Sequence, residues 1–311
     1  MTNLYYEYPE SLSVMKRLKP FAYFEPATLA EASKILIDQG SRAYLLAGGT
    51  DLLVRMKRGE IDLSALVNLK GIDGMNRIEL DAETGLQIGA LTTISSLEQS
   101  SLVRSAYPVL AEAAGILGSP PIRNLATLGG NIGRASPASD LAPALMVLMT
   151  RLLIDGPEGK KEFPLESIFS RPGKTTLNPG EVITSFFVPK MVVHSGAAYV
   201  RLGRRGGMDC ALVGVAVLLN LSAKSGDVAE ARIALASVAP VPIRARKAEA
   251  ELLSGPLTEE RIQKAATAAA LDSMPISDMR ASASYRKEMV KVSTRRAIEQ
   301  ARTLAGQGNN K

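Results

Sequence analysis

The stretch between Ala126 and Leu141 most restricts how this chain folds, because it concentrates glycine where two elements join. Three glycines fall within five positions: Gly129, Gly130 and Gly133. Glycine adopts positive φ readily and lets the backbone approach a ligand with no Cβ in the way. An apolar run, residues 141–146, follows and predicts a helix that begins at the stretch. Successive N–H groups beside a helix N-terminus indicate an anion site, although the pattern also suits a plain strand-to-helix connection.

Polar side chains in this stretch add a second requirement. Thr127 and Asn131 flank the glycines, and Ser139 and Asp140 precede the apolar run. A carboxylate is a poor neighbour for phosphate but a good acceptor for the hydroxyl groups of a sugar or sugar alcohol. Asp140 therefore favours a ligand that carries both phosphate and polyol, which means a nucleotide-type cofactor.

A second stretch, residues 45–53, has a similar character. Its apolar start predicts a buried strand that ends at Gly48 and Gly49. Thr50 and Asp51 then offer a hydroxyl and a carboxylate, and Asp51 suits either the ligand or the cap of a turn. The spacing is not that of the G-x-G-x-x-G dinucleotide motif. Two such segments, about eighty residues apart, predict one extended ligand held at both ends.

Together the two stretches resemble the paired flavin-binding loops of the FAD-binding, or medium, subunit of the molybdenum hydroxylases. This family includes xanthine dehydrogenase, carbon monoxide dehydrogenase, and the nicotinate and aromatic-ring hydroxylases. The matching segments are residues 47–52, residues 127–131 with Ser136-Pro137 and Asp140, residues 199–213, residues 284–286 and residues 295–297. The resemblance covers nearly the whole chain apart from about the first twenty residues.

The resemblance implies an electron-transfer subunit. FAD on this chain would take electrons from [2Fe–2S] clusters on a partner and pass them to an external acceptor. The expected partners are a small iron–sulfur subunit and a large subunit with the molybdenum cofactor, assembled as a dimer of heterotrimers. Some relatives that reduce hydroxybenzoyl thioesters carry a further cluster on this subunit, and its cysteines are absent here. The sequence identifies neither the organic substrate nor the final acceptor, whether NAD, quinone, ferredoxin or oxygen.

The resemblance also assigns cofactor-binding residues, and it assigns no catalytic residue and no metal ligand to this chain. Asp140 corresponds to an acidic position at the ribityl or ribose hydroxyls of FAD. Ile183 corresponds to an apolar position that lines the flavin, and Arg201 stands where some relatives have lysine. The expected cofactor-binding residues are Leu45, Leu46, Ala47, Gly48, Gly49, Thr50, Asp51, Leu52, Leu117, Thr127, Leu128, Gly129, Gly130, Asn131, Asp140, Ile183 and Arg201.

Composition excludes several other functions. The chain has one cysteine, Cys210, and one histidine, His194, so it can hold no internal disulfide and no cysteine-ligated cluster, and a zinc site would need mostly carboxylates. We interpret Cys210 as a small buried residue of a strand and His194 as a loop residue. Residues 172–175 resemble the end of a P-loop, but Ile168 occupies the position that requires glycine.

Charge and hydropathy restrict the partners and the location. The formal net charge is +6, yet 31 acidic residues are interspersed among 37 basic ones, and aromatic residues make up only 5% with no tryptophan. A base-stacking nucleic-acid surface is therefore poorly supported, and the excess fits an anionic cofactor or an acidic partner. Arg204 and Arg205 suit either a solvated cluster or a role at the cofactor or a subunit interface. The chain has no signal-peptide core and no apolar run of about 18 residues, so we expect a cytoplasmic protein.

The order of elements predicts an α+β fold with a two-part FAD-binding domain and a C-terminal domain. A capping box at residues 28–31, helical spacing up to Gly40 and a strand at 43–47 predict a small βαβ unit. Short strands and turns then predict an antiparallel sheet with helices. The expected divisions are residues 1–20 as an extension that could pack on a partner, 21–58 as the βαβ subdomain, 59–190 as the antiparallel-sheet subdomain, and 191–311 as the C-terminal domain.

Within these divisions the sequence places individual elements. The antiparallel subdomain includes strands at 66–69, 77–80, 86–90, 151–154 and 182–188, with a turn at 83–85. The C-terminal domain combines a small antiparallel sheet with a helix bundle, and residues 306–311 form a frayed tail. Its elements are strands at 210–221 and 231–238 and helices at 246–253, 258–271 and 284–304.

Two other functions stay open at this point. A scaffold or assembly subunit could keep the fold without the flavin, although intact glycine segments argue against it. The second open function is that of a self-sufficient flavin oxidoreductase of related fold. The sequence shows no evident acid–base set for a substrate, which argues against this function.

Overall fold

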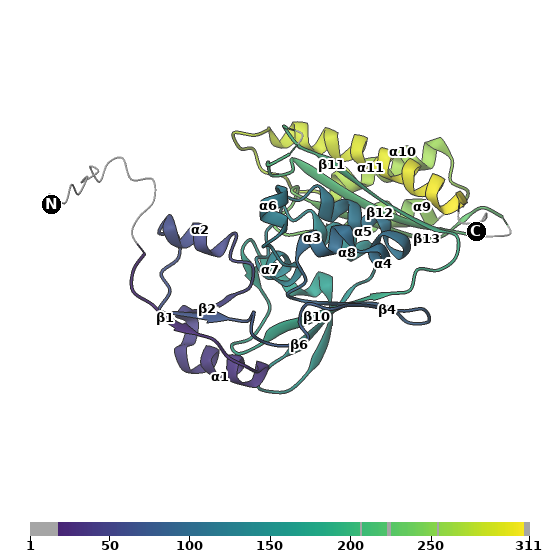
Figure 1. Ribbon diagram of the computed structural model, residues 1–311. Coiled ribbons are helices and arrows are strands. Elements are labelled where there is room, and N and C mark those ends of the chain that lie inside the picture. Colours follow the sequence, from purple (N-terminus) through teal and green to yellow (C-terminus); the bar gives the residue numbers. More distant parts are fainter. Residues whose placement is uncertain (1–17, 206, 223–224, 254, 308–311) are drawn as a thin grey trace.

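The computed structural model describes residues 18–205, 207–222, 225–253 and 255–307. Three main sheets follow one another along these residues, each with its own helices, and the expected α+β fold is confirmed (Figure 1). Most of the N-terminal extension and residues 308–311 lie outside the described part. The last helix continues to Gln307, so Gly306 and Gln307, which were expected in the tail, are helical.

The first sheet is small and parallel, with strand order β1-β3-β2. Its strands are β1 (Ala22–Phe24), β2 (Ala43–Leu46) and β3 (Ala65–Asn68). Helix α1 (Leu29–Gln39) and the 3-10 turn η2 (Gly40–Arg42) connect β1 to β2, and helix α2 (Leu52–Lys57) precedes β3. Thr28 caps α1 by accepting the N–H of Glu31 at 3.2 Å, and the carboxylate of Glu31 accepts the N–H of Ala27 rather than that of Thr28.

Strand β3 belongs to a different sheet from the one that the sequence predicted. The expected strand at residues 66–69 was placed in the antiparallel subdomain, but it pairs in parallel with both β1 and β2. The apolar pattern of β3 is compatible with a buried strand in the parallel sheet or in the antiparallel sheet. The path of the chain through α2 places β3 beside β2. The boundary between residues 58 and 59 is therefore wrong at this strand, while the other domain boundaries stay predictions.

The middle of the chain forms a five-stranded antiparallel sheet of order β4-β5-β10-β6-β7. Its strands are β4 (Ile78–Asp81), β5 (Gly85–Gly89), β6 (Arg151–Asp155), β7 (Lys161–Pro164) and β10 (Val182–Pro189). The expected turn between β4 and β5 is present, where Asp81 accepts the N–H groups of Glu83 and Thr84 and Gly85 has φ +135°. The short elements η3 (Leu165–Ile168), β8 (Phe169–Arg171) and β9 (Lys174–Thr175) follow β7.

Six short helices connect β5 to β6. They are α3 (Ile94–Gln99), α4 (Ser101–Ala106), α5 (Pro108–Gly115), α6 (Pro120–Arg123), α7 (Leu128–Gly133) and α8 (Leu141–Val147). Every residue of α8 is buried, which fits an apolar sequence packed on all sides.

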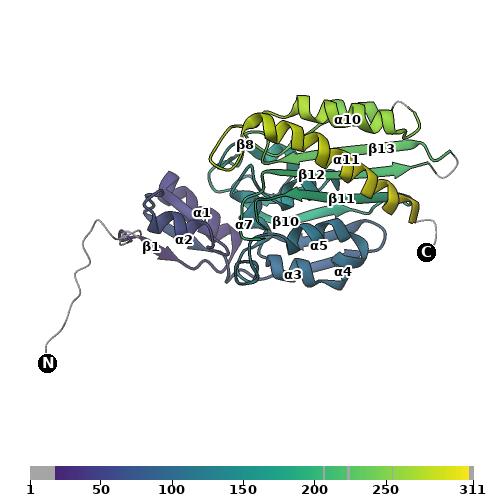
Figure 2. The same ribbon diagram turned by 90° about the horizontal axis from the view of Figure 1, so that it is seen from above.

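The third sheet has strand order β11-β12-β13-β14 and is antiparallel. Its strands are β11 (Ser195–Leu202), β12 (Val213–Leu221), β13 (Val228–Ala236) and β14 (Ile243–Arg244). Helices α9 (Arg246–Leu253), α10 (Glu259–Asp272) and α11 (Ala283–Gln307) pack on one another, and α11 crosses β11 and β12 (Figure 2). Because α8 covers the other face, β12 reads as a nearly continuous apolar run.

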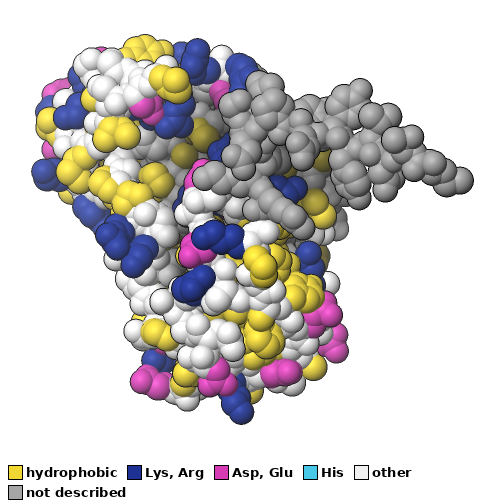
Figure 3. Space-filling model, turned by 90° about the vertical axis from the view of Figure 1, so that its left-hand side faces the viewer, with side chains coloured by type: hydrophobic (Ala, Val, Ile, Leu, Met, Phe, Trp, Pro, Cys, Tyr) yellow, Lys and Arg dark blue, Asp and Glu magenta, His cyan; other side chains and the backbone are white. Residues whose placement is uncertain are grey.

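Helix α7 lies where the first unit meets the rest of the molecule (Figures 1 and 2). Seen from the end that carries the first unit, Lys and Arg side chains are frequent across the middle of the molecule (Figure 3). In the described part of the chain, no helix combines the length and the apolar character needed to cross a membrane.

Candidate functional site

The first glycine segment connects β2 to α2, and its two glycines are required for different reasons. A Cβ on Gly48 would collide with the carbonyl oxygen of Leu125, so only glycine permits this close approach of two distant segments. Gly49 has φ +75°, which residues with a side chain rarely adopt. The first segment is therefore held directly against the residues that precede α7.

This segment also presents unpaired donors. Among the described residues, the N–H groups of residues 48–51 have no hydrogen-bond acceptor, although these residues are only half-buried or exposed. Backbone donors that lack a protein partner need water or a ligand, and several in succession suit an anion. The segment after β2 thus has the donors that a phosphate requires.

The second glycine segment is a short helix, which corrects the expectation of a loop with positive φ. Thr127 caps α7 by accepting the N–H of Gly130 at 3.0 Å, and neither Gly129, Gly130 nor Gly133 has positive φ. The N–H groups at 128 and 129 donate to the carbonyl oxygens of residues 92 and 90. The first turn of α7 therefore has no N–H group to spare for an anion.

The glycines of α7 instead remove side chains from its surface. A Cβ on Gly129 would collide with Ala90. A Cβ on Gly130 would lie 3.7 Å from the Cβ of Ala47, and one on Gly133 would meet only Ile183, at 3.9 Å. Helix α7 thus presents bare backbone toward the first segment, and a ligand can pass there without meeting a side chain.

An ion pair joins the two segments. Nε of Arg134, directly after α7, lies 2.7 Å from Oδ2 of Asp51, and Arg55 lies 3.7 Å from the same oxygen. Asp51 is the residue before α2, but its side chain makes no capping hydrogen bond. Asp51 therefore bridges the two segments instead of capping a turn.

Arg134 was not predicted as a site residue. Its Nε atom is buried and makes no hydrogen bond, even though the Asp51 oxygen is close. Nη1 lies close to Gly173, because a Cβ there would come within 3.0 Å of it. The terminal nitrogens of this guanidinium have no hydrogen-bond acceptor among the described residues, and they suit an anionic group supplied by a ligand. The sequence signal was its position, one turn after Gly130 on a helix.

Asp140 is more buried than its predicted role required. It is 7% exposed, and its Oδ1 accepts hydrogen bonds from Oη of Tyr199 and Nε of Arg201, each at 3.0 Å. Burial raises the pKa of the Asp140 carboxyl, and the Arg201 charge opposes that rise. Oδ2 has no donor among the described residues, so it is available to a ligand hydroxyl. Ser139, not Asp140, caps α8 by accepting the N–H of Ala142.

Arg201 links Asp140 to the loop after β11. Its Nη2 donates to Oδ1 of Asp209 at 3.0 Å and to the Asp209 carbonyl oxygen. Oδ2 of Asp209 accepts the N–H groups of Arg204 and Arg205 at 2.6 and 2.8 Å, and these donors together with Arg201 lower the Asp209 pKa. Residues 204, 205 and 209 of the loop after β11 are thereby tied to Arg201 beside the candidate site.

The structure does not bring every predicted residue to the surface of the site. Leu128 is fully buried in the core, and Leu46 and Leu52 pack in the small core of the first unit. Leu117 lies before α6, where its carbonyl oxygen accepts from Arg123 at 3.1 Å. Leu45 is half-buried and packs against the main core, Thr50 is half-buried, and Oδ1 of Asn131 accepts from the Ser139 hydroxyl at 2.6 Å.

The two residues considered as possible ligands lie outside the site. His194 is in a turn before β11 with φ +63°, as expected for a loop residue. Cys210 is exposed and lies in the loop before β12, so the expectation of a buried strand residue is wrong. The strand begins only at Val213, after a loop that Arg201 of β11 ties to the sheet through Asp209. No group of three His, Cys, Asp or Glu residues suitable for a metal occurs among the described residues.

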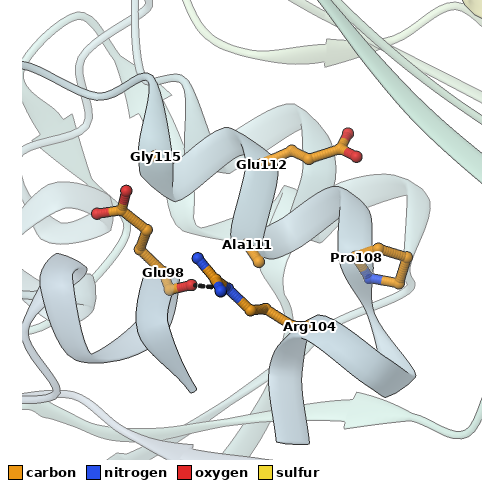
Figure 4. Close-up of a pocket in the computed structure, with 6 residues that line it drawn as sticks. All are labelled: Glu98, Arg104, Pro108, Ala111, Glu112 and Gly115. Atoms are coloured by element: carbon orange, nitrogen blue, oxygen red, sulfur yellow. Dashed lines mark hydrogen bonds between the residues drawn. The ribbon is translucent and has the colours of Figure 1, made fainter. Parts of the chain in front are cut away.

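A surface pocket of about 330 Å³ lies among α3, α4 and α5 and includes none of the predicted site residues (Figure 4). Arg104 donates to the carbonyl oxygen of Glu98 at 2.9 Å, and the Glu98 carboxylate accepts from Arg123 at 2.8 Å. These polar groups satisfy one another, but the pocket is also lined by Glu112, whose carboxyl pKa is raised by burial. The pocket therefore contains one carboxyl group without a partner among the described residues, but no acid–base pair.

Two families match consecutive parts of the chain. Residues 19–191 match the family described as "FAD binding domain in molybdopterin dehydrogenase". Residues 197–301 match the "CO dehydrogenase flavoprotein C-terminal domain". The first match includes both glycine segments and Asp140, and the second includes Arg201 and the loop that it fixes.

Relatives of known name extend over nearly the whole chain. The xanthine dehydrogenase FAD-binding subunit of Escherichia coli O157:H7 is 32% identical over 92% of this chain and 97% of that protein. The carbon monoxide dehydrogenase medium chain of Hydrogenophaga pseudoflava is 34% identical over 90% of this chain and 96% of that protein.

Solved structures agree with these relatives. The structure of carbon monoxide dehydrogenase from Hydrogenophaga pseudoflava matches with a TM-score of 0.88 and 35% identity, over 92% of this chain and 98% of that chain. Quinoline 2-oxidoreductase from Pseudomonas putida 86 matches with a TM-score of 0.85 and 27% identity, over 93% of this chain and 99% of that chain. The chain therefore belongs to the family of FAD-binding medium subunits of the molybdenum hydroxylases.

Proposed function

We propose that this chain is the FAD-binding, electron-transferring subunit of a molybdenum-containing hydroxylase or dehydrogenase. The observation that carries the proposal is the meeting of the segment after β2 with α7, next to Arg134. Unpaired backbone donors, a guanidinium and bare glycine backbone come together there, and Asp140 adds a free carboxylate oxygen. This is the combination that a phosphate and polyol cofactor requires.

The residues fit FAD part by part. The N–H groups of residues 48–51 and the terminal nitrogens of Arg134 would hold phosphate oxygens, because charge-assisted bonds from arginine and backbone donors suit them. Oδ2 of Asp140 would accept a hydroxyl of the ribityl or ribose group. Ile183 and the backbone at Gly133 would provide an apolar wall. Bound FAD supplies the electron-transfer chemistry, and this chain supplies binding and orientation.

The cofactor would be bound non-covalently. Neither glycine segment contains a histidine or cysteine that could bond to a flavin, and His194 and Cys210 lie outside both segments. Denaturing the native complex should therefore release FAD into solution. A complex that yields no free flavin on denaturation would contradict this part of the proposal.

The partners follow from the family. The chain would work with a small subunit that carries [2Fe–2S] clusters and a large subunit that carries the molybdenum cofactor. We further propose a dimer of heterotrimers in the cytoplasm. The chain has one cysteine and one histidine, so it lacks the ligands for an iron–sulfur cluster and an evident acid–base pair for substrate chemistry. This composition supports the proposal that partner subunits supply both functions.

Two alternatives predict different behaviour. A flavin-free scaffold would not need donors at residues 48–51 left without partners. A self-sufficient flavin oxidoreductase would need a substrate pocket with an acid or base beside the cofactor. The pocket at α3–α5 contains the carboxyl group of Glu112 but none of the predicted cofactor-binding residues.

The test follows electrons into the FAD-loaded chain by its absorbance at 450 nm under anaerobic conditions. The purified iron–sulfur subunit is reduced with dithionite, freed of excess reductant and mixed with this chain. We expect rapid bleaching with the reduced subunit and none with its oxidised form. Failure of the chain to retain FAD would favour the scaffold. Bleaching of the isolated chain by the organic substrate of the complex would favour the self-sufficient enzyme.

A further inference from the structure

Four large apolar side chains are exposed at one end of the third sheet. Three belong to the connection between α10 and α11, and one belongs to the loop after β11. Their exposed fractions are 61% for Met208, 64% for Met274, 69% for Ile276 and 94% for Met279. We call this set the methionine surface. Single exposed apolar residues are ordinary, but a group of them on one face indicates a binding surface.

Hydrogen bonds hold the two segments of the methionine surface together. Arg286, at 2% exposure, donates to the carbonyl oxygen of Leu212 at 3.0 Å and to Asp278 at 2.9 Å. The side chain of Arg280 interacts with those of Asp278 and Cys210. The surface is thus a fixed platform, and the end of the molecule that Figure 3 faces shows hydrophobic side chains among Lys and Arg over its upper part.

Met208 occupies a backbone conformation that a methionine does not favour. Its φ is +57°, in the left-handed region where glycine and asparagine are more readily accommodated. Its side chain is 61% exposed, so packing within this chain repays little of that strain. Strain of this kind clusters at sites of function. An apolar side chain is therefore placed here for contacts outside the chain.

The charges around the methionine surface are one-sided. The carboxylates of Asp209 and Asp278 are already occupied by arginines and backbone N–H groups. The guanidinium of Arg204 is exposed and has no carboxylate partner among the described residues, and neither has the exposed ammonium of Lys287. The surface therefore combines exposed apolar side chains with two nearby cations that lack carboxylate partners, and we call these cations its positive rim. Such a surface complements an apolar patch that carries carboxylates.

The methionine surface is continuous with the candidate cofactor site. Asp209, next to Met208, receives a hydrogen bond from Arg201, and Arg201 also donates to Asp140. A protein seated on Met208 is therefore separated from Asp140 by only two ion-paired side chains. Electron transfer through protein falls steeply with distance, so the electron donor must dock close to the cofactor.

We propose that the methionine surface is the docking site of the iron–sulfur partner subunit, through a face with an apolar centre and a rim of carboxylates. This inference rests on the proposed function and adds the location of the contact. The methionines provide flexible, polarizable apolar contacts, and the positive rim orients the partner.

The test uses the FAD-loaded full chain and the purified iron–sulfur subunit, with the dissociation constant measured by sedimentation velocity. Ile276→Asp places a charge at the apolar centre, and Val193→Asp is its matched control. Val193 is 68% exposed and lies near the opposite end of β11. We expect Ile276→Asp to weaken association about tenfold or more and Val193→Asp to leave it unchanged.

Three further variants separate docking from folding and from general charge effects. Met208→Asn suits the positive φ and should fold at least as well as the wild type, yet weaken association. Arg204→Glu should weaken it most at low salt, whereas Lys34→Glu, an exposed cation on α1, should not. FAD content at 450 nm should match the wild type in all five variants. In Ile276→Asp, Met208→Asn and Arg204→Glu, the reduced partner should bleach the flavin more slowly than in the wild type at low partner concentration. At saturating partner concentration the rate of bleaching should return to that of the wild type.

Each outcome bears on a distinct claim. Wild-type association of Ile276→Asp and Met208→Asn would overturn the docking site while leaving the FAD role intact. Loss of binding to the molybdenum subunit, with the iron–sulfur contact unchanged, would overturn the choice of partner. A wild-type chain that binds FAD but neither subunit would overturn the proposed function itself, and the docking site with it.

Discussion

Replacing Gly130 with valine should separate cofactor binding from folding. A Cβ at this position would lie 2.9 Å from Oγ1 of Thr127, so the side chain would press on the hydrogen bond that caps α7. Loss of such a cap costs about 0.5–2 kcal/mol, and the better helix propensity of valine returns a few tenths. The free energy of unfolding of the apo chain should therefore fall by at most about 1.5 kcal/mol.

The effect on FAD should be larger. The valine methyl groups would project from the bare face of α7 toward Ala47, into the space between the two glycine segments. Overpacking of this kind costs about 1–3 kcal/mol, which corresponds to an increase in the FAD dissociation constant of roughly 5- to 150-fold. The cause is steric occupation and not a forced change of φ, because Gly130 is already helical.

Two measurements on the same preparation test this reasoning. The dissociation constant comes from quenching of flavin fluorescence, and the free energy of unfolding comes from urea denaturation of the apo chain. Gly306→Val is the control, since Gly306 lies in α11 with no other group within 4 Å of an added Cβ. If Gly130→Val binds FAD as tightly as the wild type, the surface of α7 is not part of the cofactor site.

Three further substitutions probe the charged groups. Arg134→Met should weaken FAD binding by about 1.5–3 kcal/mol through loss of a charge-assisted bond, while Arg55→Met, at the same Asp51 carboxylate, should have little effect on the flavin titration. In urea denaturation, Asp140→Ala should lower the free energy of unfolding by about 1.5–3 kcal/mol. In the flavin fluorescence titration, the same variant should weaken FAD binding by roughly 0.5–1.5 kcal/mol. The carboxyl pKa of Asp278 is held below its usual value, chiefly by Arg280, so this group stabilises the fold above about pH 4 and loses that contribution as the pH falls. Asp278→Asn should therefore lower the urea midpoint of unfolding at pH 7. Between pH 5 and pH 3 the midpoint of this variant should fall less than that of the wild type. The same pH dependence in both proteins would contradict the stabilising role of the Asp278 carboxylate.

The features that sequence predicted well depend on local rules. The cap at Thr28 and the stop at Gly40 follow from side-chain hydrogen bonding and from positive φ, both of which act within one turn. The apolar run after Asp140 forms α8 because every position can be buried. Strands β12 and β13 of the third sheet and its three helices were likewise predicted, although β13 begins three residues earlier than expected, at Val228. Strands β11 and β14 of the same sheet were not predicted.

The features that sequence missed depend on contacts between distant segments. Strand β3 has the pattern of any buried strand, and its partners are decided by chain path. Gly48 was assigned to close approach of a ligand, whereas the structure uses it for close approach of Leu125. Arg134 carried no motif, and its importance appears only when Asp51 is seen beside it. Composition and periodicity contain no information on such pairings.

The arrangement around Arg201 explains how an acidic residue can be accommodated at the proposed cofactor site. Asp140 is 7% exposed, and an unpaired carboxylate so placed would cost several kcal/mol or take up a proton. Arg201 opposes this by donating from Nε to Asp140 and from Nη2 to Asp209. The fork of a guanidinium can reach both carboxylates, and a single ammonium group cannot do so as well. One oxygen of Asp140 is thereby fixed by protein donors and the other is left for a hydroxyl. The same guanidinium fixes the loop that carries Met208, so the geometry of the cofactor site and that of the proposed docking surface depend on one side chain.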